Sequence, residues 1–398
     1  MIKNEQRKLI DIGCQFSSGY AFKSSDYTDS GIPLIKIGNI QNRIVKIELE
    51  GDYFSELKID KTIEPFLLSN NDVLIAMTGQ GSVGRIGKLK LGENQRALMN
   101  QRVGKFICDE ISINKDYLYY ILTTDLYQDY LFNTGSGSGQ PNLSPELILQ
   151  TEIPWFEYKT QKNIASVLSS LDDKIDLLHR QNKTLEALAE TLFRQWFIEE
   201  AHDDWEELTL DEVITVKGGT TPSTKESSYW GGNIYWTSPR DLSNHNSVFL
   251  FDTDRKITEK GLSKIGSGLI PVGSVLLSSR APIGYLAITD IPVAINQGYI
   301  AIICDKIISN NFIYLWCKTH MEDIKNAGNG STFEEISKSN FKALSITIPP
   351  ENKLKEFDKL IKSIFDKIRT NKRQTESLEK LRDILLPKLM SGEVRVKH

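Results

Sequence analysis

Residues 158–198 read YKTQKNIASVLSSLDDKIDLLHRQNKTLEALAETLFRQWFI and contain neither proline nor glycine. Leucine recurs there at every seventh position, and a second residue of the repeat follows four positions later. A seven-residue repeat of this kind forms a narrow apolar stripe along a helix and is typical of coiled coils. We therefore predict a long helix in residues 156–200, with a seam of Leu171, Ile175, Leu178, Asn182, Leu185 and Leu192.

The same pattern returns in residues 351–398, where we predict a second long helix. Its seam is interrupted by Asn371, Thr375 and Arg382. Pro387 is expected to kink this helix or to end it early, because proline lacks the N–H that the helix needs. The apolar residues of the second seam include Ile364, Ile368, Leu378 and Leu385.

Two interpretations of these helices are open: each packs only on its own neighbouring residues, or the two pair with each other. Pairing is favoured by the narrow seam and by opposite net charge, because residues 156–200 have six Lys/Arg against eight Asp/Glu and residues 351–398 have thirteen against eight. The link at residues 199–207 cannot run back along a helix of about 50 Å, since ten extended residues cover about 35 Å. The pair is therefore predicted to be antiparallel. Asn182 either fixes its register or is a tolerated polar residue near Asn371 or Thr375.

Outside the helices, the chain repeats itself after about two hundred residues. Asn100-Gln101 returns as Asn296-Gln297, and the glycine-serine stretch at residues 135–139 returns at residues 328–332. Short β-like runs alternate with helical segments at residues 115–132 and 310–326. We predict a mixed α/β (α+β) fold in which two homologous globules, residues 1–155 and 201–350, are separated by the antiparallel coiled coil.

Composition excludes several functional classes. No stretch reaches 18 apolar residues and the first residues form no apolar signal, so we expect a cytoplasmic protein without a membrane segment. The four cysteines are dispersed and the five histidines form no H-x-x-x-H pair, which argues against a metal site. The net charge of −4 also means that any DNA-binding surface must be local.

No catalytic motif is present in the sequence. Residues 81–88 miss the phosphate-loop pattern at Ser82 and at Leu89, and no Asn-Pro-Pro-aromatic or Gly-x-Ser-x-Gly string occurs. Asp172, Asp173 and Lys174 are interpreted as a solvated charged face rather than a nuclease site. We therefore predict no catalytic residues and no enzymatic activity of the chain by itself.

A local basic surface is present around the first glycine loop, where residues 80–105 contain six Lys/Arg against one acidic residue. Amide and guanidinium side chains pair bidentately with adenine and guanine. Each such residue alone is as readily a solvated surface side chain, so the prediction depends on their occurrence in matching regions of both globules. The predicted DNA-binding residues are Gln80, Arg85, Lys88, Gln101, Arg102, Arg240, Arg280 and Gln297.

This organisation resembles the DNA specificity subunit of type I restriction-modification systems. The resemblance covers essentially the whole chain and rests on the strand at residues 72–76 with the glycine loop that follows it, Asn100-Gln101, Ile153-Pro154 followed by QKNIA at residues 161–165, and LLPKLMSGE at residues 385–393. It implies two target-recognition domains that read an asymmetric, split target in double-stranded DNA. It also implies docking of two modification (methyltransferase) subunits and of restriction/translocase subunits. S-adenosylmethionine, ATP and Mg²⁺ would then be bound by those partners, and no cofactor by this chain.

Other functions stay open at this point. The chain could be the specificity subunit of a methylase-only or type IIB-like system, which has the same sequence features. It could also be a coiled-coil scaffold that does not read DNA, which predicts no sequence-specific retention of DNA in the presence of a methyltransferase subunit. Turnover of DNA by this chain alone would instead indicate an autonomous enzyme.

Overall fold

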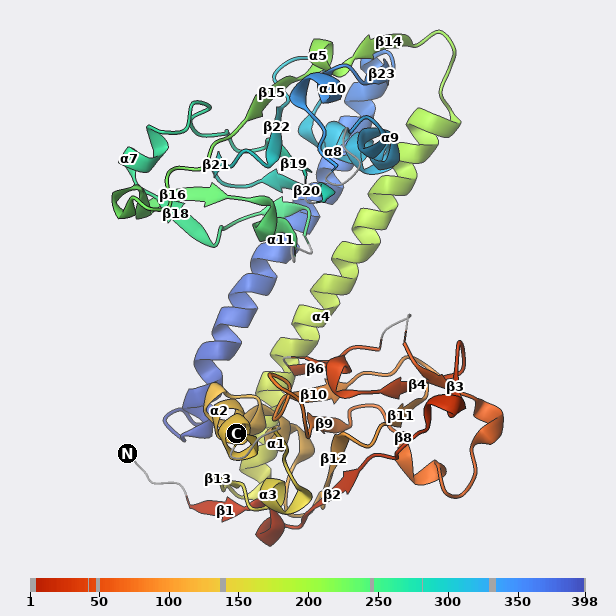
Figure 1. Cartoon of the computed structure of the whole chain (residues 1–398), viewed down its shortest axis with the longest axis vertical. Helices are drawn as coiled ribbons and strands as arrows, with labels where there is room; N and C mark the ends of the chain where they lie inside the picture. The colour runs from red at the N-terminus through yellow and green to blue at the C-terminus, as the bar shows by residue number, and fades with distance from the viewer. Residues whose placement is uncertain are drawn as a thin grey trace. The chain divides into compact units, whose positions relative to one another are not determined.

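The computed structural model describes residues 5–41, 43–47, 51–136, 141–243, 247–280, 282–328 and 334–396. The chain divides into two compact units, unit 1 (Met1–Ile175 with Ser377–His398) and unit 2 (Asp176–Glu376). Helices α4 (Tyr158–Arg194) and α11 (Glu351–Met390) each contribute one half to each unit (Figure 1). The two predicted long helices are therefore present, and each unit combines one globule with half of each helix.

Unit 1 is built on a six-stranded sheet with the order β2-β12-β9-β10-β6-β5. Its central strand β9 (Val73–Ala76) is wholly buried, because both faces of the sheet are covered. Val73 and Ile75 pack in the cluster that contains helix α1, whereas Leu74 and Ala76 pack against a second sheet with the order β3-β7-β4-β11-β8. The alternation follows from the two-residue period of a strand.

The other strands of unit 1 are β1 (Gln6–Lys8), β2 (Cys14–Ser18), β3 (Tyr27–Thr28), β4 (Ile32–Ile35), β5 (Ile40–Gln41), β6 (Arg43–Val45), β7 (Tyr53–Phe54), β8 (Leu67–Leu68), β10 (Ile86–Leu89), β11 (Ala97–Met99), β12 (Val103–Cys108) and β13 (Glu152–Pro154). Its shorter helices are α1 (Lys115–Leu122), α2 (Asp125–Gly135) and α3 (Pro145–Leu149).

Unit 2 repeats this plan, which confirms the predicted internal repeat. Its main sheet has the order β15-β22-β19-β20-β17, and β19 (Val275–Ser279) takes the central position of β9. In both units the central strand pairs antiparallel with both neighbours. Strands β4 and β11 pair in parallel in unit 1, as β16 and β21 do in unit 2.

The remaining elements of unit 2 are β14 (Glu206–Thr209), β15 (Thr215–Gly218), β16 (Trp230–Thr237), β17 (Phe249–Leu250), β18 (Arg255–Ile257), β20 (Ile283–Thr289), β21 (Ala294–Ile295), β22 (Tyr299–Ile303) and β23 (Ser345–Ile348), with helices α5 (Leu210–Val213), α6 (Pro239–Ser243), α7 (Glu259–Leu262), α8 (Asn310–Thr319), α9 (Met321–Asn326) and α10 (Lys338–Lys342).

The two shorter helical segments predicted from sequence are each split into two helices. Residues 115–132 form α1 and most of α2, which are separated at Thr123 and Thr124, and α8 and α9 are separated at His320. The hydroxyl groups of Thr123 and Thr124 donate to the carbonyls of Tyr120 and Ile121 at 3.0 and 2.8 Å. Such local hydrogen bonds compete with the helical pattern, and Thr124 then stands at the N-cap of α2.

The long helices pair antiparallel, as predicted. In unit 2, Asn182 of α4 contacts Asn371 of α11, and further along α4 the ring of Phe193 lies 6.0 Å from that of Phe357. In unit 1, the start of α4 shares a core cluster with the end of α11, through Leu168 and Leu389. At 1.5 Å per residue, the 37 residues of α4 extend over about 55 Å.

The helix seam is wider than a strict coiled coil. Ile175, Leu178, Ile364 and Ile368 are buried, whereas the other predicted seam leucines are partly exposed: Leu171, Leu185, Leu192, Leu378 and Leu385. Ile164, Ala165 and Phe193 are buried beside the seam, because each helix half also packs on the globule of its own unit. The helices therefore both pair with each other and pack on their neighbouring globules, so each of the two interpretations is correct in part.

Pro387 does not end α11. The helix continues to Met390, and the N–H of Ser391 still donates to the carbonyl of Pro387 at 3.0 Å. Proline has no N–H, so Pro387 cannot donate to the carbonyl of Asp383, four residues earlier. The loss of this one hydrogen bond does not end the helix. The turn after the helix is then made by Gly392, which has a left-handed φ of 73°. The predicted early end is therefore wrong.

A polar pair lies in the seam of unit 2, with Asn371 buried and Asn182 half-buried. The amide Nδ2 of Asn371, which is fully buried, donates to Oδ1 of Asn182 at 2.9 Å, and Nδ2 of Asn182 donates to the carbonyl of Ile368 at 3.3 Å. Of the two possibilities for Asn182, this contact supports a role in setting the register. An axial shift of either helix would leave the buried amide of Asn371 without its acceptor on Asn182.

We expect Asn371→Ala to lower the free energy of unfolding by about 1–3 kcal/mol, because it leaves the Asn182 carbonyl without a donor. Urea unfolding followed by circular dichroism measures the change. Gln374→Ala is the matched control, since Gln374 lies on the exposed face of the same helix and such surface changes stay within about 0.5 kcal/mol. An Asn371→Ala variant as stable as the control would show that the pair does not hold the helices.

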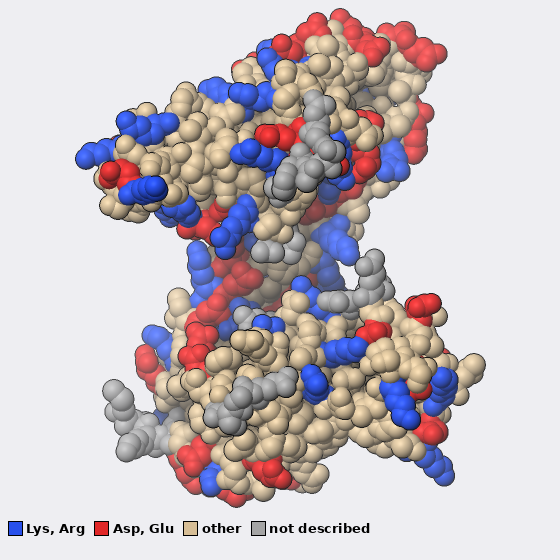
Figure 2. All heavy atoms as spheres, viewed as in Figure 1, with Lys and Arg blue, Asp and Glu red and all other residues tan. Residues whose placement is uncertain are grey.

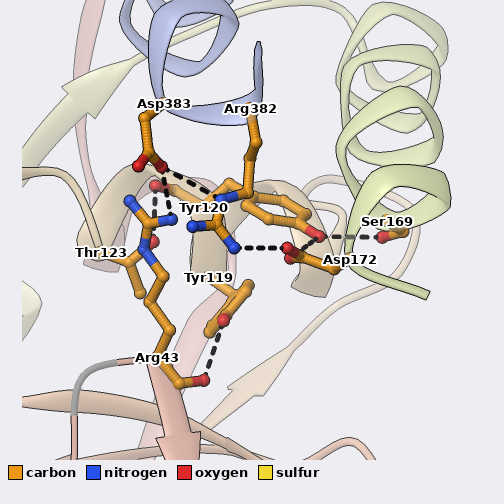
Figure 3. Close-up of polar contacts among 8 residues, drawn as sticks. All are labelled: Arg43, Tyr119, Tyr120, Thr123, Ser169, Asp172, Arg382 and Asp383. Atoms are coloured by element: carbon orange, nitrogen blue, oxygen red, sulfur yellow. Dashed lines mark hydrogen bonds and ion pairs between the residues drawn. The ribbon is translucent and has the colours of Figure 1, made fainter. Parts of the chain in front are cut away.

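A second polar contact joins the two helices in unit 1 (Figure 3). Nη1 of Arg382 lies 2.9 Å from Oδ1 of Asp172, and Oδ2 of the same carboxylate accepts from the hydroxyl of Tyr120 at 2.7 Å. The side chain of Asp172 is only 21% exposed. The prediction of a solvated face is therefore wrong for Asp172, whereas Asp173 and Lys174 are exposed as expected.

The contact extends from the helices to the sheet of unit 1. Nη1 of Arg43, at the start of β6, donates to Asp383 at 2.9 Å, and the hydroxyl of Tyr119 donates to the Arg43 carbonyl at 2.8 Å. Burial raises the pKa of Asp383, but hydrogen bonds from Arg43 and Arg382 outweigh it, so the pKa of this carboxyl is below its usual value. The end of α11 is thus held to α4 and to the sheet by ion pairs, and the hydroxyls of Tyr119 and Tyr120 connect α1 to the same residues.

Candidate nucleic-acid interface

Four of the predicted residues lie around the C-terminal end of the central strand β9 in unit 1: Gln80, Arg85, Gln101 and Arg102. We call this end of the sheet, where β9 stops, the sheet edge. The N–H of Ala76 donates to the carbonyl of Arg85 at 3.0 Å, and the N–H of Met77 donates to the carbonyl of Arg102 at 2.9 Å. Arg85 and Arg102 therefore flank the end of β9 on its two sides. Gln80 belongs to the β9–β10 loop and Gln101 to the turn before β12, so these side chains come from neighbouring loops.

Glycine fixes the loop that carries Gln80 and Arg85. Gly79 and Gly84 have left-handed φ values of 107° and 82°. A Cβ on Gly84 would lie 2.9 Å from the Cβ of Leu131 in α2, so the loop is pressed onto that helix. Gln80, Gln101 and Arg102 are exposed and Arg85 is half-buried. Among the described residues, neither arginine forms an ion pair.

Part of the predicted basic surface is neutralised inside the domain. The side chain of Lys88 is 12% exposed, its Nζ lies 2.8 Å from Asp116, and it lies 4.3 Å from the ring centroid of Tyr119. Lys105 similarly lies 3.4 Å from Asp72. Lys88 is therefore held by its own unit, and we remove it from the candidate interface.

Unit 2 presents the same sheet edge. The N–H of Ser279, the last residue of β19, donates to the carbonyl of Gly298 at 2.8 Å. This bond makes Gly298 the equivalent of Arg102 and Gln297 the equivalent of Gln101, whereas Arg280 stands at the position of Thr78. Arg280 lies 3.6 Å from Glu335, and Oε1 of the exposed Gln297 accepts from the hydroxyl of Thr221 at 2.7 Å.

A pocket of about 420 Å³ lies at this edge of unit 2. It brings together Arg240 from α6 and Arg280 from the end of β19, which are far apart in the sequence. The other polar residues of its wall include Tyr285 and Asn296. Sequence reasoning missed Tyr285, whose position on β20 after Gly284 corresponds to Arg85 after Gly84. The sequence signal that would have found it is the glycine shared at positions 84 and 284, both of which have a left-handed φ in the structure.

A second group of cations in unit 2 lies on aromatic rings. The guanidinium of Arg255 lies 3.5 Å from a ring centroid of Trp230, and Nζ of Lys256 lies 4.6 Å from that of Tyr235. Figure 2 shows Lys and Arg side chains gathered at the end of unit 2 that carries α7, β16 and β18. Cations on aromatic rings at the surface can contact phosphate groups.

Within the described part of the chain, no group of three or more His, Cys, Asp or Glu side chains is arranged to hold a metal ion. The four cysteines are free thiols. No helix in the described ranges combines the length and the apolar character that a membrane span needs. Residues 137–140 and 329–332 of the two repeated glycine-serine stretches lie outside the described residues.

Comparison with known proteins gives a consistent result. The family model described as "Type I restriction modification DNA specificity domain" matches residues 1–187 and 202–380. The specificity subunit of the type I restriction enzyme MjaIX from Methanocaldococcus jannaschii is 38% identical over 194 residues, which cover 48% of this chain and 45% of that protein, so the match spans less than half of its length. The HindI specificity subunit from Haemophilus influenzae is 23% identical over 73% of this chain and 80% of its own length.

One solved structure is similar over nearly the whole fold. It is the S subunit of a type I restriction-modification system from M. genitalium, with a TM-score of 0.64 and 17% sequence identity. The match covers 98% of this chain and 96% of that one. At this identity the likeness concerns the fold, namely two repeated globules and two long helices.

Proposed function

The chain belongs to the family of type I restriction-modification DNA specificity subunits, and we propose that its two units each read one part of a split, asymmetric target in double-stranded DNA. The observation that carries the proposal is the equivalent sheet edge in the two units. One edge presents Arg85, Gln101 and Arg102, and the other presents Arg280 and Gln297. Guanidinium and amide groups are the side chains that read guanine and adenine in the major groove.

The two edges differ in side chains, which supports an asymmetric target. Unit 1 has two arginines without an ion pair among the described residues, whereas Arg280 of unit 2 is paired with Glu335. The net charge of −4 is compatible with this function if partner subunits supply much of the phosphate contact. In such a complex the specificity chain contributes base contacts rather than overall charge.

We further propose that two modification subunits dock on the long helices and that restriction/translocase subunits join through them. Apolar side chains on the outer faces of both helices support this docking. Leu177 and Leu188 of α4 are 39% and 45% exposed, and Leu381 and Ile384 of α11 are 44% and 58% exposed. S-adenosylmethionine, ATP and Mg²⁺ would be bound by these partners, and the specificity chain would bind no cofactor and catalyse no step.

Arg102→Ala is expected to reduce methylation of the cognate site about tenfold, because one good base contact contributes about 1–3 kcal/mol. The rate is measured on duplex DNA with the full-length chain and its methyltransferase subunit. Arg7→Ala is the control, since Arg7 lies on β1, outside the sheet of β9, and pairs with Glu5. Unchanged methylation in Arg102→Ala and Arg85→Ala would remove both from the interface. Absence of any sequence-specific DNA retention by the wild-type complex would instead favour a scaffold.

A further inference from the structure

A residue just beyond the central strand forms an isolated antiparallel β-bridge in each unit, two positions after the end of β9 and directly after the end of β19. Thr78 pairs with Asn142 in unit 1, and Arg280 pairs with Glu335 in unit 2. The two bridges are structurally equivalent, because each stands next to a matching hydrogen bond. The N–H of Leu143 donates to the Met77 carbonyl at 2.8 Å, and the N–H of Ile336 donates to the Ser279 carbonyl at 3.0 Å.

Both bridges lie at the sheet edge that we assign to DNA. Met77, which precedes Thr78, is bonded to Arg102, and Ser279, which precedes Arg280, is bonded to Gly298. Asn142 and Glu335 are exposed on the second strand of each bridge. Each of them stands three positions after one of the repeated glycine-serine stretches, and the equivalent position holds a different side chain in each unit.

The carboxylate of Glu335 is unusual at a surface that binds DNA. An exposed acid repels DNA phosphate, so it lowers affinity wherever it does not accept a hydrogen bond. The exocyclic N4 amino group of cytosine is a donor that a carboxylate can accept from, and the guanine paired with that cytosine offers O6 and N7 to an arginine. Arg280 and Glu335 together therefore match the two edges of one G·C pair.

We propose that the bridge position determines which base pair each unit reads. Arg280 and Glu335 read a G·C pair in the half-target of unit 2, and Asn142 reads the adenine of an A·T pair in the half-target of unit 1. An asparagine amide pairs bidentately with N6 and N7 of adenine. The inference rests on the proposed DNA-reading function and adds the class of base pair that each unit selects.

The ion pair within the bridge does not prevent this contact. The side chains of Arg280 and Glu335 are 39% and 49% exposed, and their charged atoms lie 3.6 Å apart. Such exposed pairs add little stability. The pair orients both side chains in the free protein, and a base pair can replace the contact between them.

Selection from a duplex library with randomised bases tests the proposal, with the full-length chain in complex with its methyltransferase subunit. Arg280→Lys keeps the charge but removes the planar, bidentate donor pair. We expect guanine preference to fall roughly 5- to 150-fold at one position of one half-target, with the other positions unchanged. A loss of affinity that is equal for all sequences would overturn the proposal, because it would indicate a phosphate contact.

The double variant Arg280→Thr with Glu335→Asn gives unit 2 the bridge residues of unit 1. We expect the same target position to change from G·C to A·T. Both replaced side chains are exposed, so no core contact is removed. Arg7→Gln is the control, because Arg7 is a partly exposed arginine on β1, outside both the long helices and the sheet of β9. An unchanged consensus in the double variant would refute the role of the bridge and would leave the proposed DNA-reading function in place. A wild-type complex that selects no sequence would refute the proposed function and this inference with it.

Discussion

Replacing Asp172 by alanine is expected to destabilise unit 1 by about 3 kcal/mol. Its carboxylate lies 2.9 Å from Arg382, and the two side chains are 21% and 15% exposed. Removal of one partner of a buried pair costs about 3–5 kcal/mol, and among the described residues Arg382 would keep only its contact with Asp383, 3.1 Å from its Nε. The partial exposure of Asp172 places the expected value at the low end of that range. Tyr120 would also lose the acceptor of its hydroxyl.

A double-mutant cycle separates the pair from the helix around it. The cycle compares Asp172→Leu, Arg382→Leu and the double variant. The double variant is expected to recover most of the loss of either single variant, because an apolar pair of similar volume removes the cost of burying charge, whereas Tyr120 and Asp383 still lose a hydrogen-bond partner. Asp173→Ala is the control, since Asp173 is exposed on the same helix. If the losses of the two single variants simply add in the double variant, the two residues are not coupled.

The effect should be confined to unit 1, because unit 2 holds its helices with aromatic side chains. There Phe193 of α4, Phe357 of α11 and Phe312 of α8 form one buried cluster, with ring centroids 5.1–6.2 Å apart. Hydrogen exchange measured by peptide is the decisive readout. Faster exchange in α1 and β6 with unchanged exchange in α8 would confirm the assignment, and uniform acceleration in both units would contradict it.

The long helices could be predicted from sequence because their signal is local. The leucines at seven-residue spacing and the absence of proline and glycine over residues 158–198 determine α4 without any tertiary information. The contacts between the helices could not be predicted in the same way. Asn182 meets Asn371 rather than Thr375 because the axial position of each helix depends on how Ile164 and Phe357 pack on their globules.

The candidate interface was predicted only in part, because some of its signals are local in the sequence and others are not. The repeat of Asn100-Gln101 at Asn296-Gln297 located equivalent turns next to the central strands. A count of local charge nevertheless assigned Lys88 to the surface, because its partner Asp116 comes from α1 and is invisible in the neighbouring sequence. The β-bridges were missed because each joins residues that are distant along the chain.

The motif QKNIA at residues 161–165, which we used to identify the family resemblance, has a structural role. Gln161 is fully buried, and its Oε1 accepts from the N–H of Asn114 at 2.9 Å. Asn114 is the N-cap of α1, and its side chain accepts from the N–H of Tyr117. Gln161 therefore connects the start of α4 to the start of α1. The attachment of α4 to the first globule is therefore specific, which matters for exchange of that globule between proteins.

Exchange of the first globule for that of another family member is expected to change one half of the recognised target and to leave the other half unchanged. Each unit has its own core and its own sheet edge, so the side chains of one edge do not depend on those of the other. The change is measured by mapping methylated adenines in DNA from cells that express each chimera with the methyltransferase subunit. A change in both halves would contradict the modular reading.

The structure also specifies where the exchange should be made. Residues 1–155 leave behind Ile164 and Leu168 of α4 and Leu386 and Leu389 of α11, which belong to the core of unit 1. A chimera of residues 1–155 therefore places a foreign globule on native helices, and we expect it to lose about 1–3 kcal/mol of stability. A chimera of residues 1–175 together with 377–398 transfers the whole core with its charged contacts, and should be as stable as the parents. Both chimeras should read the same new half-target, because the sheet edge is identical in the two; different targets would mean that the helices themselves take part in reading the DNA.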